Sequence, residues 1–152
     1  MQSDAQIVHA QTDDLPALLA LYLQLHPADP APEGEGLMKL WDELLNDPNY
    51  HILLAKTDGQ LAASVTVVVV KNLTRTARPY AIIENVITDS NHRRQGLASA
   101  LLAEAVRIAQ AANCYKISLT TGSKEEGTLR FYESCGFNRR DKTAFIRWLV
   151  HT

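Results

Sequence analysis

The sequence predicts a single mixed α/β domain in which an antiparallel first half is followed by a β-α-β crossover. An Asp58-Gly59 dipeptide joins two runs rich in β-branched residues, which is typical of a hairpin. Further on, an apolar run over 80–88 precedes an amphipathic helix pattern over 95–112, and another apolar run follows it. The chain has 152 residues, of which 46% are hydrophobic and 21% are charged, as expected for one domain over 1–152.

The first half of the chain is predicted to hold two helices and three strands. Thr12 or Asp13 would cap the first helix, and Pro16 is tolerated in its first turn. A loop over 27–36, with three prolines and two glycines, leads to a second helix whose leucines and Trp41 recur at helical spacing. The predicted elements are strands over 7–10, 50–56 and 60–71, and helices over 15–25 and 37–45.

The second half is predicted to alternate strands with helices. A basic polar loop over 72–79 leads into it, and Gly136 is placed to stop its last helix. The predicted elements are strands over 80–88, 115–121 and 143–150, and helices over 95–112 and 125–135.

Charge, cysteine usage and hydropathy exclude several classes of protein. A net charge of −2 disfavours a nucleic-acid binder that relies on bulk charge. The two cysteines, Cys114 and Cys135, match neither a metal motif nor a disulfide framework, and the histidines are scattered, so no metal site is expected. The start of the chain does not resemble a signal peptide, and the longest apolar run, over 61–70, is too short to span a bilayer. We therefore expect a cytoplasmic protein with no membrane partner.

The segment from Arg93 to Ala98 is the strongest functional feature. It opens the helix predicted over 95–112, where backbone N–H groups lack partners inside the helix and carry partial positive charge. Gly96 would let phosphates approach the backbone closely, and two arginines add formal charge. The pattern indicates a pyrophosphate site; the alternative is a solvated basic turn. Neither G-x-G-x-x-G nor a P-loop is present, which disfavours other nucleotide-binding domains.

Three segments in a fixed order resemble those of the GNAT superfamily of acetyl-CoA-dependent N-acetyltransferases. Ile83–Thr88 is followed by the loop, which is similar to the R-x-x-G-x-G/A signature with Ala98 last, and then by the F-Y-x-x-x-G-F run over 131–137. The resemblance covers nearly the whole chain. It implies a central sheet of about six to seven strands flanked by about four helices. Strands 80–88 and 115–121 would splay apart to form a cofactor cleft.

The same resemblance implies how acetyl-CoA is held. The strand edge over 86–88 would pair with the pantetheine arm, and a backbone N–H there, that of Ile87, would bind the thioester oxygen. Glu125 stands where many family members carry an asparagine that contacts the cofactor. Ser123 or Lys124 would replace that contact; the alternative is that both are solvated loop residues. The expected cofactor-binding residues are Val86, Ile87, Thr88, Arg93, Arg94, Gln95, Gly96, Leu97, Ala98, Ser99, Ser123 and Lys124.

Two side chains are candidates for proton transfer. Glu84 occupies a position where the family often places a base, acting directly or through a water; the alternative is a carboxylate paired with a loop arginine. Tyr132 matches the tyrosine that often protonates the departing sulfur; the alternative is a packing aromatic. The resemblance implies direct attack by the amine in a ternary complex, without an acyl-enzyme. A sensor that binds acyl-CoA without catalysis is a further alternative.

The acceptor is expected to be a primary amine of a small molecule. The family usually binds it against the first two helices and the loop over 72–79, which here offer Tyr22, His26, Trp41 and Arg78. Glu33 and Glu35 would attract a cationic acceptor such as an aminoglycoside or polyamine, whereas Arg75 and Arg78 would attract an anionic one. The run Asn113–Ile117 and Glu84 are similar to glucosamine-6-phosphate N-acetyltransferases; a protein or peptide acceptor also stays open. A homodimer is expected, because many relatives are dimers.

Overall fold

The computed structural model describes residues 5–150, which form two compact units divided after Leu119. The first unit contains one sheet with strand order β1-β2-β3-β4-β5. The first three pairings are antiparallel, and β4 pairs with β5 in parallel. The strands are β1 (Gln6–His9), β2 (Tyr50–Thr57), β3 (Gln60–Val70), β4 (Tyr80–Thr88) and β5 (Ile117–Ser118).

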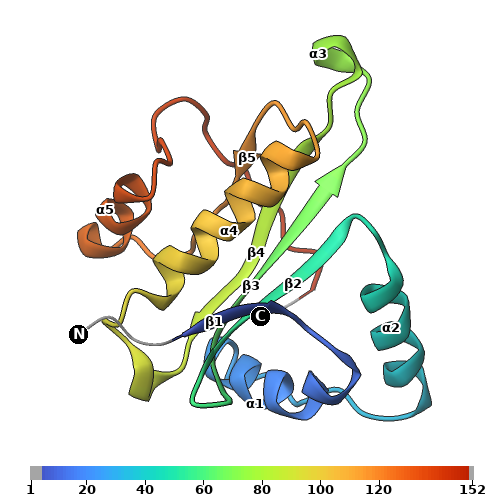
Figure 1. The fold of residues 1–152 in the computed structure, drawn as a ribbon. Coiled ribbons are helices and arrows are strands. Elements are labelled where there is room, and N and C mark those ends of the chain that lie inside the picture. Colours follow the sequence, from blue (N-terminus) through green and yellow to red (C-terminus); the bar gives the residue numbers. More distant parts are fainter. Residues whose placement is uncertain (1–4, 151–152) are drawn as a thin grey trace. The chain divides into compact units, whose positions relative to one another are not determined.

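Four helices accompany this sheet, and Figure 1 shows the longest of them, α4, running along the strands apart from α1 and α2. Pro16 lies in the first turn of α1, where its missing N–H costs no hydrogen bond. Within residues 5–150, no helix combines the length and apolar character that crossing a membrane requires. The four helices are α1 (Leu15–Leu25), α2 (Glu35–Asn46), α3 (Thr74–Ala77) and α4 (Leu97–Ala111).

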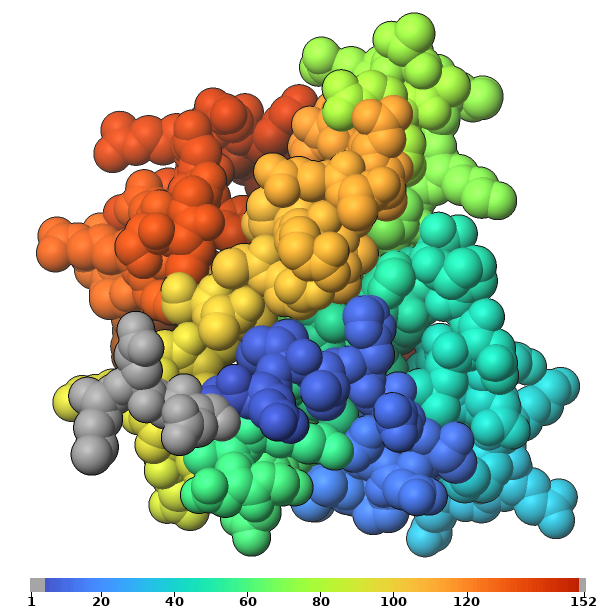
Figure 2. Space-filling model, in the orientation of Figure 1, coloured from blue at the N-terminus to red at the C-terminus, as the bar shows by residue number. Residues whose placement is uncertain are grey.

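The two faces of the sheet differ in how completely they are covered. Side chains alternate along a strand, so residues of one parity share a face. On the odd-numbered face, the apolar side chains of the central strands are buried beneath α4, and Figure 2 shows α4 covering that side. They are Leu53, Ala55, Ala63, Val65, Val67, Val69, Ala81 and Ile83.

The even-numbered face is covered only in part. Ile52 and Leu54 pack against α1 and α2 in a cluster with Leu15, Leu18 and Trp41. Beyond these helices the same face is half-buried or exposed, and we call this part the open sheet face. It consists of Tyr50, Val68, Val70, Tyr80, Ile82, Glu84, Lys116 and Ser118.

Several elements predicted from local sequence are confirmed. Asp58 and Gly59 both have positive φ, of 51° and 78°, as a two-residue hairpin turn between β2 and β3 requires. In the second unit, α5 (Glu126–Ser134) ends where Gly136, at φ 95°, lets two N–H groups fold back. The Gly136 N–H donates to the Glu133 carbonyl, and the Phe137 N–H donates to that of Tyr132.

Two predictions about the strands are wrong. The sheet of the described residues has five strands instead of six to seven, and the strand predicted over 115–121 is reduced to Ile117–Ser118. Residues 143–150 form no strand, and Phe145 is 92% exposed. A strand is stabilised by its hydrogen-bonded neighbour, and no neighbour in the second unit pairs with this run. Apolar alternation alone therefore gave a false strand.

Candidate functional site

The loop from Asp89 to Gly96 places an open helix N-terminus at the end of β4. The first hydrogen bond of α4 joins the Ala100 N–H to the Gly96 carbonyl at 3.0 Å. The N–H groups of Leu97 and Ala98 precede this bond, so the helix provides no acceptor for them. No side chain caps this end of α4, and its first turn holds no acidic residue. An anion could therefore accept hydrogen bonds from these N–H groups directly.

Gly96 explains why the chain can turn tightly at this point. Its φ of 76° is left-handed, a conformation that favours glycine. A Cβ built there would meet no atom within 4 Å, so the space above the backbone is open. Arg93 and Arg94 precede it in the chain and are exposed, and no carboxylate of the described residues pairs with either one. This stretch fits the predicted pyrophosphate site.

A polar contact from α1 fixes the entry to this loop. The Gln24 side chain donates to Asp89 Oδ1 at 2.6 Å and accepts from the Ser90 N–H at 3.0 Å. His92 Nδ1 lies 2.7 Å from the other carboxylate oxygen of Asp89. The contacts with Gln24 and His92 lower the pKa of Asp89. Sequence reasoning missed Gln24, which no local pattern marks.

A shallow cavity of about 470 Å³ is lined in part by Gln24 and Asp89, but Glu84 does not line it.

The strand before the loop carries a β-bulge. Glu84 pairs with Thr66 and Ile87 with Ser64, so Asn85 and Val86 together oppose the single residue between those two partners. Asn85 accordingly has a left-handed φ of 54°. The β4–β5 ladder is recorded only as far as Ile82, leaving 83–88 without a partner on that edge among the described residues. The free edge includes Val86, Ile87 and Thr88, where the pantetheine arm was predicted to pair.

Glu84 lies on the open sheet face, on the same side as α1. It is exposed, and no cation lies within ion-pairing distance among the described residues. The structure thus gives no support to the alternative that it pairs with a loop arginine. A carboxylate in this position is free to accept a proton, either directly or through a water.

Two tyrosines lie near Glu84 on the same face. Burial raises the pKa of Tyr22, and the neighbouring side chains of Thr66, Ser64 and Asn85 act against that rise. Thr66 lies close enough to affect Tyr22, but its buried hydroxyl has no hydrogen bond of acceptable geometry. The pKa of Tyr50 is raised first by burial and then by the proximity of Tyr22 and Glu84. Tyr50 was not predicted as a site residue, although its parity on β2 places it on the face of Glu84.

The other predicted acceptor residues lie apart from this group. His26 is exposed at the end of α1. Trp41 is 2% exposed, and its indole N–H donates to the Thr12 carbonyl at 3.1 Å, so its position favours a role in the core. Arg78 donates to the carbonyls of Asn113 and Cys114 at 3.1 and 3.2 Å. Acceptor binding by these three residues stays a prediction.

Tyr132 lies in the second unit, on α5. Burial raises the pKa of its phenol, and nearby Cys135 adds to the rise. Its ring lies 5.2 Å from that of Phe131 and 6.5 Å from that of Phe137, centroid to centroid. A phenol in this environment keeps its proton at neutral pH, as a general acid must.

Ser123 and Lys124, the remaining predicted cofactor-binding residues, lie just before α5. The Ser123 hydroxyl accepts from the Glu125 N–H at 3.3 Å, so it stabilises the turn before α5. Lys124 is exposed. Within residues 5–150, no three His, Cys, Asp or Glu side chains are grouped as metal ligands.

Comparison with known proteins identifies the family and the fold. A profile of the acetyltransferase (GNAT) family matches residues 15–137. A solved, provisionally named acetyltransferase from Agrobacterium tumefaciens is 38% identical, with a TM-score of 0.86 over 94% of this chain and 99% of that one. An aminoglycoside N-acetyltransferase solved in complex with CoA shares the fold, with a TM-score of 0.78 and 18% identity over 99% and 98% of the two chains.

Two further relatives have different named acceptors. A glucosamine 6-phosphate N-acetyltransferase from Trypanosoma brucei brucei is 31% identical over 84 residues. The match covers 55% of this chain and 55% of that relative, which is only about half of its length. An aminoglycoside N(6')-acetyltransferase from Serratia marcescens is 26% identical over 144 residues, covering 93% and 97% of the two chains. The similarities agree on the class of reaction and differ on the acceptor.

Proposed function

The chain belongs to the acetyltransferase (GNAT) family, and from that premise we propose that it transfers an acetyl group from acetyl-CoA to a primary amine of a small molecule. The observation that carries the proposal is the open N-terminus of α4 beside the unpaired edge of β4 and the unpaired carboxylate of Glu84. The first two features suit the pyrophosphate and the pantetheine arm of acetyl-CoA. The carboxylate of Glu84 suits a base that takes a proton from the attacking amine.

Acetyl-CoA would be held by the backbone of this chain. The N–H groups at the start of α4 have no acceptor within the helix to donate to, and Arg93 and Arg94 add charge beside them. The edge of β4 over 86–88 would hydrogen-bond with the pantetheine amides in the manner of an added strand. The Ile87 N–H would donate to the thioester oxygen, which polarises the carbonyl and stabilises the negative charge that develops there. When bound, acetyl-CoA supplies the activated acetyl group.

Glu84 and Tyr132 would manage the protons. An alkyl amine has a pKa of roughly 10, so it is mostly protonated at neutral pH and must lose a proton before it attacks. Glu84 would accept that proton directly or through a water. The Tyr132 phenol, whose pKa is raised by burial, would protonate the departing sulfur. Attack is direct, and neither Cys114 nor Cys135 is assigned as a nucleophile.

The experiment that tests this proposal measures thiol release from acetyl-CoA in the presence of amines. The panel contains amino sugar phosphates, aminoglycosides, polyamines, amino acids and peptides. The expected result is turnover with at least one class of small amine. If the protein binds acetyl-CoA but releases no thiol with any of them, the proposal of a small-molecule acetyltransferase fails, and a protein acceptor or a sensor of acyl-CoA replaces it.

A further inference from the structure

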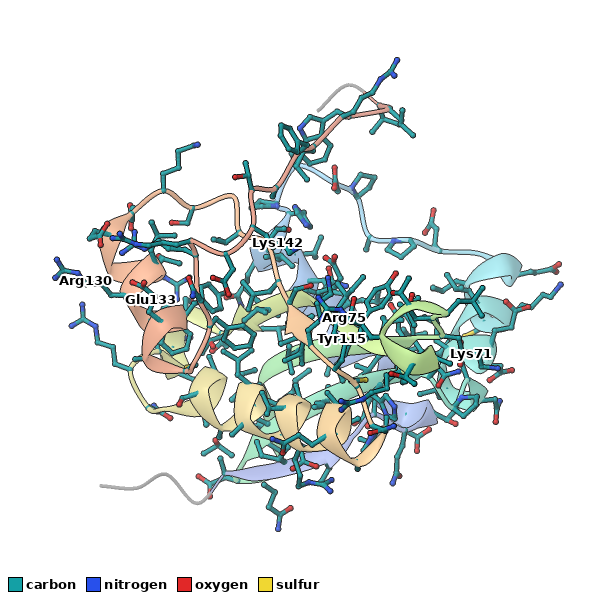
Figure 3. All side chains as sticks on the ribbon, turned by 90° about the horizontal axis from the view of Figure 1, so that it is seen from above. Lys71, Arg75, Tyr115, Arg130, Glu133 and Lys142 are labelled. Carbon is teal, nitrogen blue, oxygen red and sulfur yellow. The ribbon has the colours of Figure 1, made fainter. Side chains whose placement is uncertain are left out.

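The open sheet face ends in a cluster of cations and aromatic rings at the start of β4, whereas the loop from Asp89 to Gly96 follows the other end of that strand. The Lys116 ammonium lies 5.4 Å from the ring centroid of Tyr80 and 5.6 Å from that of Tyr115. The Arg75 guanidinium lies 5.4 Å from the Tyr115 ring centroid, and Figure 3 shows these two side chains together. Tyr80 and Tyr115 meet edge to face at 6.3 Å. We call these four residues the cationic end.

The charge of the cationic end is not neutralised. Among the residues that the structure describes, no carboxylate lies within ion-pairing distance of Lys116 or Arg75. Both side chains belong to exposed residues, and the rings beneath them supply attraction without a formal negative charge. Two cations held side by side without a counter-charge form a site that favours an anion.

The segment that carries Arg75 is held in an unusual conformation. Arg75, Thr76 and Ala77 all have left-handed backbones, with φ of 56°, 61° and 59°. Such a run is rare for L residues, and strain of this kind accumulates at functional sites. The Asn72 amide braces the turn by donating to the Thr74 carbonyl at 3.1 Å and hydroxyl at 3.0 Å, and to the Arg78 carbonyl at 3.1 Å.

Arg78 fastens the same turn to the chain just before β5. Its guanidinium donates to the carbonyls of Asn113 and Cys114, which directly precede the Tyr115 and Lys116 of the cationic end. The braced turn and the β5 segment are thereby fixed to each other. Arg75 and Lys116 are consequently both held near the Tyr115 ring.

The cationic end shares its sheet face with Glu84. Tyr80 and Glu84 lie on one strand with the same parity, four positions apart. Lys116 directly precedes β5, and its ammonium lies over the Tyr80 ring. At about 3.3 Å per residue, the two positions are on the order of 13 Å apart along β4. Val68 and Ile82 line the face nearby. An extended acceptor could therefore contact both ends at once.

We propose that the cationic end binds an anionic group of the acceptor, so that the acceptor is an amine carrying a phosphate or carboxylate on the order of 10 Å from the reacting nitrogen. This inference rests on the proposed function, because Glu84 is taken as the end at which the amine reacts. It assigns Arg75 and Lys116 to substrate specificity, and Arg78 to positioning Arg75.

The test is a series of ω-aminoalkyl phosphates with two to ten methylenes, compared with amino alcohols of the same length and with ω-amino carboxylic acids. Thiol release from acetyl-CoA gives kcat/KM for each compound. We expect kcat/KM of the anionic compounds to exceed that of the alcohols by about ten- to a hundredfold, as one charge-assisted contact would give. This preference should appear only once the methylene chain is long enough to reach from Glu84 to the cationic end. The better of the two anionic series identifies the anion.

Variants of the cationic end make the comparison specific. In Lys116→Glu and in Arg75→Glu, the ratio of kcat/KM for phosphate over alcohol should fall at least tenfold, while Lys116→Arg should keep it. Arg107→Glu is the matched control, because Arg107 lies on α4 over the opposite face. Calorimetry of 8-aminooctyl phosphate with the CoA-bound protein gives the same comparison without turnover.

The outcomes separate this inference from the proposed function. If amino alcohols and anionic amines are turned over at equal rates, the cationic end does not bind the acceptor, but the proposed acetyltransferase activity still holds. An anion preference that persists in both charge-reversal variants would also overturn this role of the cationic end. Absence of thiol release with every amine, together with no calorimetric binding of 8-aminooctyl phosphate, would overturn both.

Discussion

Glu84 is the residue on which the proposed chemistry depends most. We expect Glu84→Gln to lower kcat by about a hundredfold or more, because the amide cannot accept the proton of the amine. Affinity for acetyl-CoA should stay within about twofold. The loss should shrink as the pH approaches roughly 10, where alkyl amines lose their proton unaided.

Steady-state kinetics from pH 6 to pH 10, with calorimetry for acetyl-CoA, check the Glu84 prediction. Glu104→Gln provides the control, since this carboxylate lies on α4 and pairs with Arg107. A Glu84→Gln protein that turns over at the normal rate would remove the base role.

Tyr132 is tested by removing only its hydroxyl. Tyr132→Phe keeps the ring that contacts Phe131 and Phe137, and we expect kcat to fall about tenfold with little change in acetyl-CoA affinity. The effect is modest because a thiol has a pKa of roughly 8.5 and departs readily as thiolate. Burial raises the pKa of this phenol, so it holds its proton at neutral pH and loses it only above its ordinary value of about 10. The alkaline fall in kcat should therefore begin above that value and be absent in Tyr132→Phe; an unchanged kcat would leave Tyr132 as a packing residue.

Arg75 and Arg78 show why residue type alone does not assign a role. Both were predicted to attract an anionic acceptor. In the structure, Arg78 donates to two backbone carbonyls, whereas Arg75 lies over the Tyr115 ring without a carboxylate partner. These contacts join segments far apart in sequence, and they are the basis of our proposal that Arg75 binds the anion while Arg78 positions Arg75.

At the level of the elements, one ion pair ties the start of α1 to β2. Lys56 Nζ lies 2.8 Å from Asp14 Oδ1, and the Gln11 N–H donates to Oδ2 at 2.7 Å. Burial would raise the pKa of Asp14, but these two hydrogen bonds outweigh it and hold the pKa below its ordinary value. A carboxyl group with a lowered folded pKa contributes stability above its unfolded pKa of about 3.9, and that stability is lost as the pH falls through the folded pKa.

The corresponding prediction concerns Asp14→Asn. The variant should be less stable than the wild type by about 1 kcal/mol at pH 7, and the difference should shrink as the pH falls below about 4. Urea unfolding at several pH values measures it. Asp13→Asn, an exposed neighbour, should stay within about 0.5 kcal/mol of the wild type. A deficit that is the same at pH 3 and pH 7 would contradict this account of Asp14.

The elements that local sequence predicted well are those whose signals are local. The Asp58-Gly59 hairpin, the long helix α4 and the Gly136 stop depend on turn chemistry and helical periodicity, and each is confirmed. The bulge at Asn85 could not be predicted, because it exists only in register with β3. The false strand over 143–150 failed for the same reason, since its pairing partner is not encoded within the run.

For the molecule as a whole, the motifs gave the family, and the family profile confirms it over residues 15–137. The site was only partly accessible from sequence. The loop over 93–99 and Glu84 follow from motifs, whereas Tyr50, Gln24 and the cationic end become visible only when strand parity and long-range contacts are known. We propose that these long-range features select the acceptor, whereas the local sequence cues pointed both to cations and to anions.

The central claim is that the N-terminus of α4 holds the pyrophosphate of acetyl-CoA, and calorimetric titration of Gly96→Glu tests it most directly. The same substitution at Gly34, which also has a positive φ and open space around it, is the matched control. We predict that the wild type and Gly34→Glu bind acetyl-CoA alike, while Gly96→Glu loses at least tenfold in affinity, because its carboxylate enters the space meant for the phosphates. Normal binding of acetyl-CoA by a folded Gly96→Glu protein would contradict the claim.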